Sequence, residues 1–275
     1  MDKSNKLDEL KQLSYLAKNI RREAFKAVYH AKSAHLGSAM SCVDILTALY
    51  FGTIQENEKF ILSKGHACSA LYATLAEKGI LNRELFNTYM KEGSPLTAHC
   101  DTSVPGVHFS TGSVGMGLSV ATGIAYADKI DSALDGNKRK TYALLSDGDL
   151  NEGSTWEAIM FAGHHKLDNL VTIIDNNNLQ AYGKTDEVIQ VNGPVYCKIS
   201  DKFRAFNWGA KEIDGHSMKE ITEAYKDVPF DKYKPSVIIA KTIKGKGISF
   251  LEGKIESHYL TPNEQHYQTA MEELK

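Results

Sequence analysis

The chain alternates short apolar runs with longer stretches in which apolar residues recur every three or four positions. The short runs are typical of buried strands, and the three-to-four spacing is typical of helices that bury one face. Because strands and helices alternate, the predicted fold class is α/β, a parallel sheet flanked by helices on both faces. We predict strands at 59–63, 141–145, 170–174, 208–213 and 236–241. We predict helices at about 8–30, 66–78, 82–91, 118–130, 151–166, 196–206 and 217–226, and another that follows a capping box at 41–44 and ends at Phe51.

The stretches between these elements predict loops within a single domain. Residues 93–111 contain two prolines and predict a long loop, and residues 133–139 predict a turn. Since no repeat, low-complexity tract or linker interrupts the pattern, we expect one domain over 1–275 with a loop-rich tail after about 243. Ligands of such folds bind at the carboxyl ends of the strands.

Composition and charge narrow the class of protein. Hydrophobic residues make up 42% of the 275 residues and charged residues 24%, as in ordinary globular proteins. A net charge of −2 without a basic arm argues against nucleic acid, and no stretch approaches the roughly 18–20 apolar residues of a membrane helix. The N-terminus lacks the apolar core of a signal peptide. Cytoplasmic localisation is also indicated by four widely spaced cysteines without a CxxC pair, Cys42, Cys68, Cys100 and Cys197.

Polar residues follow two of the predicted strands at the point where each strand ends. Asp147 and Gly148 come after the strand at 141–145, and Asn177 follows the next strand thirty residues later. Parallel neighbouring strands would bring these ends side by side, and carboxylate and amide oxygens suit Mg²⁺ or Ca²⁺. Gly148 would let a diphosphate approach its N–H at a helix start. The residues alone leave open the alternative of two ordinary polar turns.

The same residues resemble a known cofactor motif. The run 147–153 (DGDLNEG) with 175–177 (DNN) is similar to the thiamine-diphosphate motif GDG…NN, although Ser146 replaces the first glycine. Further stretches resemble the N-terminal cofactor domain of transketolase over about 24–262: 62–67 (LSKGHA), 110–117 (STGSVGMG), 156–158 (WEA), 241–247 (KTIKGKG) and 257–258 (SH). The resemblance implies the thiamine-diphosphate-binding fold.

The resemblance implies a cofactor site of thiamine diphosphate and a divalent metal, Mg²⁺, Ca²⁺ or Mn²⁺. The metal would be bound by the side chains of Asp147 and Asn177 and by the carbonyl of Leu179. The glutamates Glu152 and Glu157 would lie at a dimer interface that links two active sites, with a solvated helix face as the alternative. The implied cofactor-binding set is His66, Gly112, Ser113, Val114, Gly148, Asp149, Glu157, Asn177 and His258.

Four histidines are implied as catalytic: His35, His66, His99 and His258. Histidines can donate to a developing alkoxide or move a proton near pH 7. The sequence around His35 and His99 departs from the family's GHPG and GHPE. Beyond His258, residues 259–262 (YLTP) replace a Gly-Ala-Pro, and Lys244 replaces an apolar residue common in full-length enzymes. The remaining six histidines, His216 among them, are interpreted as structural or surface residues.

The resemblance implies the N-terminal subunit of a split transketolase, which transfers a two-carbon ketol unit from a ketose to an aldose. The pyrimidine-binding domain would belong to a C-terminal partner subunit in an assembly of two copies of each chain. The donor could be a pentose phosphate, apulose phosphate or a sulfonated ketose. The alternatives are the α subunit of a 2-oxo acid dehydrogenase, deoxyxylulose-phosphate synthase, and a non-catalytic thiamine-diphosphate-binding module.

Overall fold

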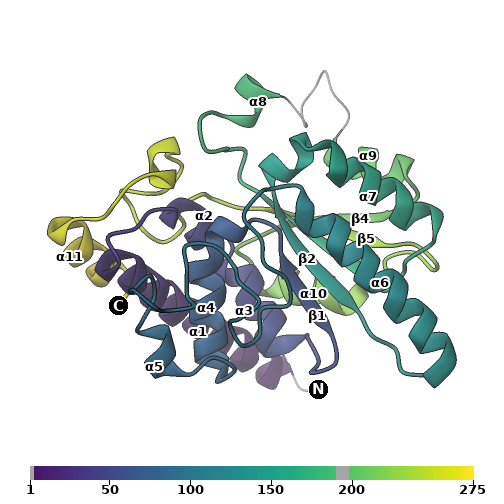
Figure 1. Cartoon of the computed structure of the whole chain (residues 1–275), viewed down its shortest axis with the longest axis horizontal. Coiled ribbons are helices and arrows are strands. Elements are labelled where there is room, and N and C mark those ends of the chain that lie inside the picture. The colour runs from purple at the N-terminus through teal and green to yellow at the C-terminus, as the bar shows by residue number, and fades with distance from the viewer. Residues whose placement is uncertain (1–2, 190–197) are drawn as a thin grey trace.

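Five parallel strands form the sheet on which the molecule is built. The computed structural model describes residues 3–189 and 198–275, and the sheet order is β1-β2-β3-β5-β4 with every neighbouring pair parallel (Figure 1). All five predicted strands are confirmed, as is the α/β class. The strands are β1 (Lys59–Leu62), β2 (Thr141–Ser146), β3 (Leu170–Asn176), β4 (Gly209–Asp214) and β5 (Ser236–Lys241).

Helices cover both faces of this sheet, as predicted. Short 3₁₀ turns at Gly65–Ala67, Asp147–Asn151 and Ile255–His258 lie among them. The helices are α1 (Lys3–His30), α2 (Leu36–Ser41), α3 (Val43–Gly52), α4 (Cys68–Lys78), α5 (Arg83–Phe86), α6 (Met116–Asp135), α7 (Gly153–His164), α8 (Thr185–Val188), α9 (Ile199–Ala205), α10 (Met218–Asp227) and α11 (Glu264–Glu273).

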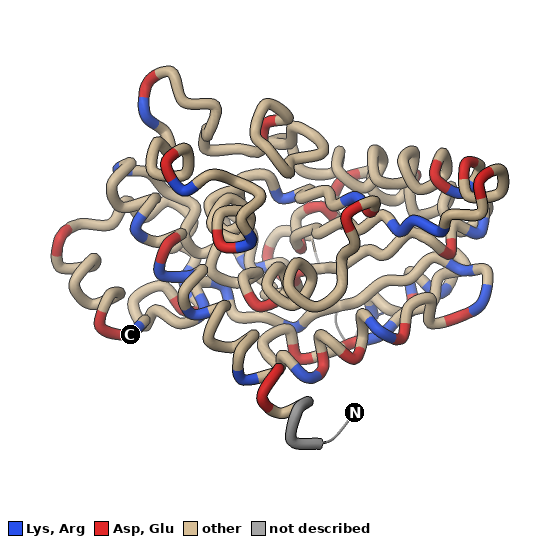
Figure 2. The backbone as a smooth tube through the Cα atoms, turned by 90° about the horizontal axis from the view of Figure 1, so that it is seen from below, with Lys and Arg blue, Asp and Glu red and all other residues tan. Residues whose placement is uncertain are grey.

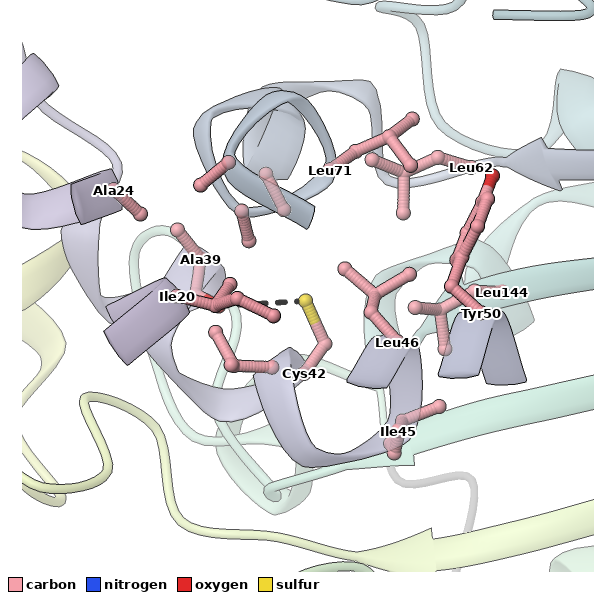
Figure 3. Packing of buried hydrophobic residues seen from close by; sticks show 14 of the residues in the cluster. Ile20, Ala24, Ala39, Cys42, Ile45, Leu46, Tyr50, Leu62, Leu71 and Leu144 are labelled. Carbon is pink, nitrogen blue, oxygen red and sulfur yellow. Dashed lines mark hydrogen bonds between the residues drawn. The ribbon is translucent and has the colours of Figure 1, made fainter. Parts of the chain in front are cut away.

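The core has two halves, because successive residues of a strand point to opposite faces of the sheet. Phe60 and Leu62 of β1 belong to the half that contains α1, α3, α4 and α10, whereas Ile61 faces α6, α7 and α9. Figure 3 shows the first half from close by, with side chains of α1, α3 and α4 packed over Leu62 and Leu144. Burial on both faces explains why β2, β3 and β5 are apolar over most of their length, whereas the edge strand β4 is partly exposed and contains Lys211 and Glu212.

Several predicted boundaries differ from the structure. The helix expected at 82–91 ends at Phe86, and the turn expected at 133–139 begins late because α6 continues to Asp135. The predicted capping box was wrong: Cys42 is the N-cap residue of α3, and no side chain caps its N-terminus. The tail after residue 243 ends in α11, a helix that was not expected. Part of the predicted helix at 196–206, with Cys197, lies outside the described residues.

The surface carries interspersed charges of both signs. Figure 2 shows lysine and arginine residues interspersed with aspartate and glutamate residues along the chain. In the described part of the chain, the helices are too short or too polar to cross a membrane.

Candidate active site

The carboxyl ends of β2 and β3 lie side by side, as the sequence predicts. Ser146 pairs with Asp175 in the register of the two strands, which places Asp147 beside the loop that follows β3. The Asp147 carboxylate is fully buried and accepts hydrogen bonds from Asn176 Nδ2 at 2.5 Å and from the N–H groups of Asn177 and Asn178 at 2.9 and 2.8 Å. The two polar strand ends are therefore one site.

Ser146 fits the position where a glycine is usual. Its backbone is extended, with φ of −100°, so no left-handed conformation is required. Its hydroxyl and its N–H both donate to Asp149 Oδ2 at 2.7 Å. The serine thus caps the 3₁₀ turn that begins at Asp147, which explains how the departure from the motif is accommodated.

Asp149 lies behind the site and ties three segments together. Its other oxygen accepts the N–H of Gly115 at 2.8 Å and the hydroxyl of Ser63. Since these donors come from the end of β1 and the start of α6, the buried carboxylate fixes their positions relative to β2. The contacts of Asp149 support a positioning role for this residue.

A cavity of about 200 Å³ opens at these strand ends. Its wall contains six of the residues predicted to bind cofactor or metal, or to take part in catalysis. These are His66, Val114, Gly148, Asn177, Leu179 and His258. Asn177 Oδ1 accepts the N–H of Leu179 at 3.1 Å, so the side chain and the backbone of this loop are held together at the cavity wall. Burial raises the pKa of the neighbouring Asp147 to about 7.

Four imidazoles gather beside this cavity. The ring centre of His35 lies 5.0 Å from that of His258, 5.7 Å from that of His66 and 5.8 Å from that of His99. The rings of His66 and His258 are 5.2 Å apart. The structure therefore brings together all four histidines predicted as catalytic, although they lie up to 223 positions apart in the sequence.

The histidine-bearing segments are tied to one another through the backbone. His35 has φ of +70°, a conformation uncommon for a residue other than glycine, and its N–H donates to the carbonyl of His258 at 2.9 Å. Tyr72 Oη donates to the carbonyl of His99 at 2.9 Å. These bonds hold the imidazoles in place without using their ring nitrogens.

Three of the imidazoles are held neutral. Burial lowers the pKa of His35, and burial with the nearby Lys64 lowers the pKa of His66 well below its usual value. Burial and Lys244 lower the pKa of His258 to about 3. At neutral pH each of these rings presents one nitrogen as donor and one as acceptor.

The segment 112–114 lies at the edge of the site. Gly112 contacts His99, since a Cβ placed on it would meet the imidazole ring at 3.5 Å, and Ser113 is exposed. Among the predicted residues, Glu157 does not line the cavity; it lies exposed on α7. Glu152 does line it, next to Gly115.

Two buried lysines were not predicted as site residues. Lys64 pairs with Asp175, and its Nζ also donates to the carbonyl of Ser38 at 2.9 Å. Burial and Lys64 act in opposite directions on the pKa of Asp175, and the lysine prevails, so that pKa is lowered. Both lysines stand in segments quoted for the family resemblance, at 62–67 and 241–247, so the signal for them was present in the sequence.

Lys244 is the second of these lysines. Both lysines line the cavity, but Lys64 pairs with a carboxylate and Lys244 with a neutral group. Lys244 is only 2% exposed, and its Nζ donates to the neutral carbonyl of Gln180 at 2.9 Å. Burial and Lys64 lower the pKa of Lys244 to about 8. A buried cation beside a neutral acceptor is stabilised by an anionic ligand.

The residues at the cavity fit a divalent cation and a diphosphate. Asp147 Oδ1 accepts one N–H and retains a lone pair, and Asn177 and Leu179 add an amide and a backbone oxygen, the donors that Mg²⁺ and Ca²⁺ prefer. Gly148 presents no side chain, and Lys244 supplies the positive charge. In the described residues, clusters of three or more histidine, cysteine, aspartate or glutamate side chains suited to a metal are absent, so a site for softer metals is not indicated.

Comparisons with known proteins agree with this geometry. The family described as "Transketolase, thiamine diphosphate binding domain" matches residues 13–273. The chain is 38% identical to one of the subunits of apulose-4-phosphate transketolase from Phocaeicola vulgatus, covering 97% of this chain and 95% of that one. It is 37% identical to 6-deoxy-6-sulfo-D-fructose transketolase subunit SqwG of Clostridium sp. (strain MSTE9), covering 96% of each.

Longer proteins match over part of their length. The chain is 37% identical to the transketolase of Homo sapiens but spans only 41% of it. Among solved structures, transketolase from Leishmania mexicana superposes with a TM-score of 0.88 at 26% identity, and that from Campylobacter jejuni with 0.85 at 30%. The chain covers 95% and 96% of its own length in these matches but spans 41% and 43% of the solved chains.

Proposed function

The chain belongs to the family of transketolase thiamine-diphosphate-binding domains, and we propose that it is the cofactor-binding subunit of a split transketolase. The reaction is the transfer of a two-carbon ketol unit from a ketose donor to an aldose acceptor. One observation carries this proposal: the cavity at the ends of β2 and β3 adjoins the group of four imidazoles. A cation–diphosphate site and a set of neutral proton-handling groups thus meet in one place.

The strand ends would hold the polar part of the cofactor. Asp147, Asn177 and Leu179 supply oxygens for Mg²⁺, with Ca²⁺ or Mn²⁺ as alternatives. Gly148 and His66 face the diphosphate, and we add Lys244 to this set because its buried charge lies at the same cavity.

The other predicted residues lie around this polar part. Gly112, Ser113 and Val114 line the aminopyrimidine end, and Asp149 holds this segment through Gly115. Glu157 on α7 and Glu152, which directly precedes that helix, would face the second half of the assembly.

The histidines would manage protons and charge during ketol transfer. When bound, thiamine diphosphate supplies a carbon nucleophile and an electron sink for cleavage of the carbon–carbon bond. His35, His66, His99 and His258 surround the space where the substrate hydroxyl and carbonyl groups would lie. Because three of them are held neutral, each can donate a hydrogen bond to a developing alkoxide or accept a proton at neutral pH.

A second subunit would complete the active site. The full-length transketolases that match this chain are more than twice as long, and the relatives that match end to end are named as subunits. We propose a C-terminal partner with a pyrimidine-binding domain, in an assembly of two copies of each chain. The partner would also select among sugar phosphates, apulose phosphate and sulfonated ketoses. The proposed location is the cytoplasm, in keeping with the buried cysteines Cys42, Cys68 and Cys100, which are free of disulfide bonds.

Native co-purification from the source cells, with mass spectrometry of the chains recovered, tests the proposal. We expect a partner of stoichiometric amount with a transketolase-like pyrimidine domain. The reconstituted pair should transfer ketol units from a ketose phosphate or a sulfonated ketose to an aldose, whereas this chain alone should be inactive. Full activity of the purified chain by itself would contradict the proposed division between two subunits.

A non-catalytic binding module is the second candidate to be separated by experiment. Both candidates require metal-dependent cofactor binding through Asp147, so the Asp147→Ala variant tests the site and the activity assay tests catalysis. We expect Asp147→Ala to abolish Mg²⁺-dependent binding of thiamine diphosphate. Unchanged metal-dependent binding in that variant would refute the metal assignment, and binding without ketol transfer by any reconstituted pair would favour the module.

A further inference from the structure

The loop that follows β5 carries Lys244 into the cavity and is attached to the molecule at three successive points. Thr242 N–H donates to the carbonyl of Asn176 at 3.1 Å, and Gly245 N–H donates to the carbonyl of Gly37 at 2.9 Å. Between them, the N–H of Ile243 donates to a side chain, Nε2 of His216, at 2.8 Å. Two backbone contacts and one imidazole therefore bind the amide groups of this loop, and two side chains add the bonds of the Thr242 hydroxyl to Asp175 and of Lys244 Nζ to Gln180.

The His216 contact joins Ile243 to a segment outside the loop, whereas the carbonyl of Ile243 accepts the N–H of Lys246 of the same loop at 3.1 Å. Ile243 is 39% exposed, so the packing of its side chain fixes its position less firmly than that of a buried residue. Ile243 directly precedes Lys244, whose Nζ lies at the cavity wall. A shift of the Ile243 backbone would therefore be transmitted to the buried ammonium group.

His216 is in turn fixed by charged groups from two helices. Its Nδ1 lies 2.7 Å from Asp44 Oδ2, and since Nε2 accepts a hydrogen bond from the Ile243 N–H, Nδ1 must be the protonated nitrogen that donates to Asp44. Arg21 of α1 binds the same carboxylate through two nitrogens, one of them at 3.1 Å from Oδ1. Asp44 and Arg21 are both less than a tenth exposed.

The ion pair keeps Asp44 in its charged form. Burial alone would raise the pKa of Asp44, but Arg21 and the bond from His216 outweigh it and the pKa is lowered. Of the two neutral tautomers of His216, the charged Asp44 favours the one with its proton on Nδ1, and this tautomer leaves Nε2 free to accept. Ile243 therefore donates to His216, and His216 donates to Asp44, which also accepts from Arg21, so every donor in this set meets an acceptor.

We propose that His216 is a positioning residue of the cofactor site, which holds the Ile243 backbone so that Lys244 faces the bound diphosphate. This inference rests on the proposed function in one respect, the assignment of the cavity to a diphosphate. The hydrogen-bond chain itself belongs to the fold. His216 lies outside the cavity wall and does not touch the cofactor, so its effect passes through the loop.

Two amide variants distinguish the roles of the two ring nitrogens of His216. The amide of asparagine can replace Nδ1 as donor to Asp44 but does not reach Ile243, whereas the oxygen of glutamine can reach the Nε2 position. His216→Asn should therefore release the Ile243 N–H, and His216→Gln should retain it. The first measurement is hydrogen–deuterium exchange of the peptide spanning 241–248 in the full chain, without cofactor. We expect faster exchange in His216→Asn and exchange close to wild type in His216→Gln.

The second measurement is the affinity of the full chain for thiamine diphosphate with Mg²⁺, by titration calorimetry. The net value of one hydrogen bond predicts a loss of about 3- to 10-fold in His216→Asn and a change of less than twofold in His216→Gln. Thermal midpoints of both variants show whether either substitution acts through global unfolding.

The outcomes distinguish this inference from the proposed function. Wild-type exchange and affinity in His216→Asn would overturn the positioning role, as would a loss in His216→Gln with His216→Asn intact, because the Asp44 contact alone would then matter. If the wild-type chain binds no thiamine diphosphate, the proposed function fails. The exchange of residues 241–248 then still decides whether His216 holds the loop.

Discussion

At Gly148, a single added methyl group should weaken cofactor binding without disturbing the folding of the chain. A Cβ placed there would meet only the Ser146 hydroxyl, at an ordinary contact distance of 3.6 Å, so the chain should fold normally. The same Cβ would occupy space next to the proposed diphosphate. We expect Gly148→Ala to weaken Mg²⁺–thiamine diphosphate binding about tenfold or more, because an extra methyl group at a close contact costs about 1–3 kcal/mol.

Gly52→Ala is the matched control for this substitution. Gly52 is the last residue of α3 and does not line the cavity, and a Cβ there meets nothing within 4 Å. Titration calorimetry should give wild-type affinity for Gly52→Ala. Equal affinities of the two variants would show that the diphosphate does not approach Gly148.

His258 should make the stability of the metal-free chain depend on pH. Its pKa in the folded chain is about 3, while an unfolded histidine titrates near 6.5. Between these values the unfolded state binds a proton that the folded state does not, so stability is present above pH ~6.5 and is lost as the pH falls toward 3. For one group the loss is at most about 1.4 kcal/mol per pH unit.

Urea unfolding at several values between pH 4.5 and 7.5 measures this slope. We expect His258→Gln to lose less stability than the wild type as the pH falls. The raised pKa of Asp147 acts with the opposite sign, and the comparison of variant with wild type removes it because both chains contain Asp147. Identical slopes in the two proteins would mean that His258 is as easily protonated in the folded as in the unfolded chain.

Among the elements, the strands could be predicted from their apolar runs. The long amphipathic helices could be predicted from apolar residues that recur every three or four positions. The helix α2 could not: all six of its residues are buried, so it has no polar face, and it begins after His35 in a left-handed conformation without a side-chain cap. The predicted capping box at 41–44 failed for a related reason. Ser41 donates to Asp175 and Asp44 binds Arg21. Both side chains are therefore engaged in tertiary contacts and do not cap the helix.

The candidate site was predictable where it depends on strand ends and not where it depends on tertiary pairing. Asp147 and Asn177 follow adjacent parallel strands, and their meeting follows from the topology alone. The gathering of the histidines was known only through the family resemblance, since they come from separate loops and turns. The pairing of Lys64 with Asp175 and of His216 with Asp44 joins residues more than 100 positions apart, which no local pattern reveals.

The contact of α6 with the end of β1 depends on a glycine. A Cβ on Gly117 would lie 2.5 Å from Ser63 Cβ and 2.6 Å from Ser63 Cα, so α6 would have to move away from the strand. We expect Gly117→Ala to destabilise the chain by about 1–3 kcal/mol in urea unfolding. The movement would also disturb Ser63 and Gly115, which both donate to Asp149.

Gly123→Ala provides the control on the same helix. A Cβ there meets nothing within 4 Å, and alanine is the better helix former, so stability should rise by about 0.5–1 kcal/mol. If Gly117→Ala were as stable as Gly123→Ala, the close approach of α6 to β1 would not be needed for folding.

For the molecule as a whole, ligand binding should be measurable as stability, because a ligand that binds only the folded chain shifts the unfolding equilibrium. At a hundredfold excess over its dissociation constant, Mg²⁺–thiamine diphosphate should add about 2.7 kcal/mol. For a chain of 275 residues this corresponds to an increase in Tm of roughly 5–10 °C. The measurement needs neither the partner subunit nor a substrate.

The comparison of thiamine diphosphate with thiamine then tests which part of the site provides the binding. The cavity offers Lys244, Gly148 and Asn177, with the buried carboxylate of Asp147 beside them, to a metal and a diphosphate, so thiamine with Mg²⁺ should leave Tm unchanged. Asp147→Asn should lose most of the shift with thiamine diphosphate, because a neutral amide replaces the carboxylate ligand. Equal shifts with thiamine and its diphosphate would mean that binding does not depend on the ends of β2 and β3, and the assignment of the whole cavity would have to be abandoned.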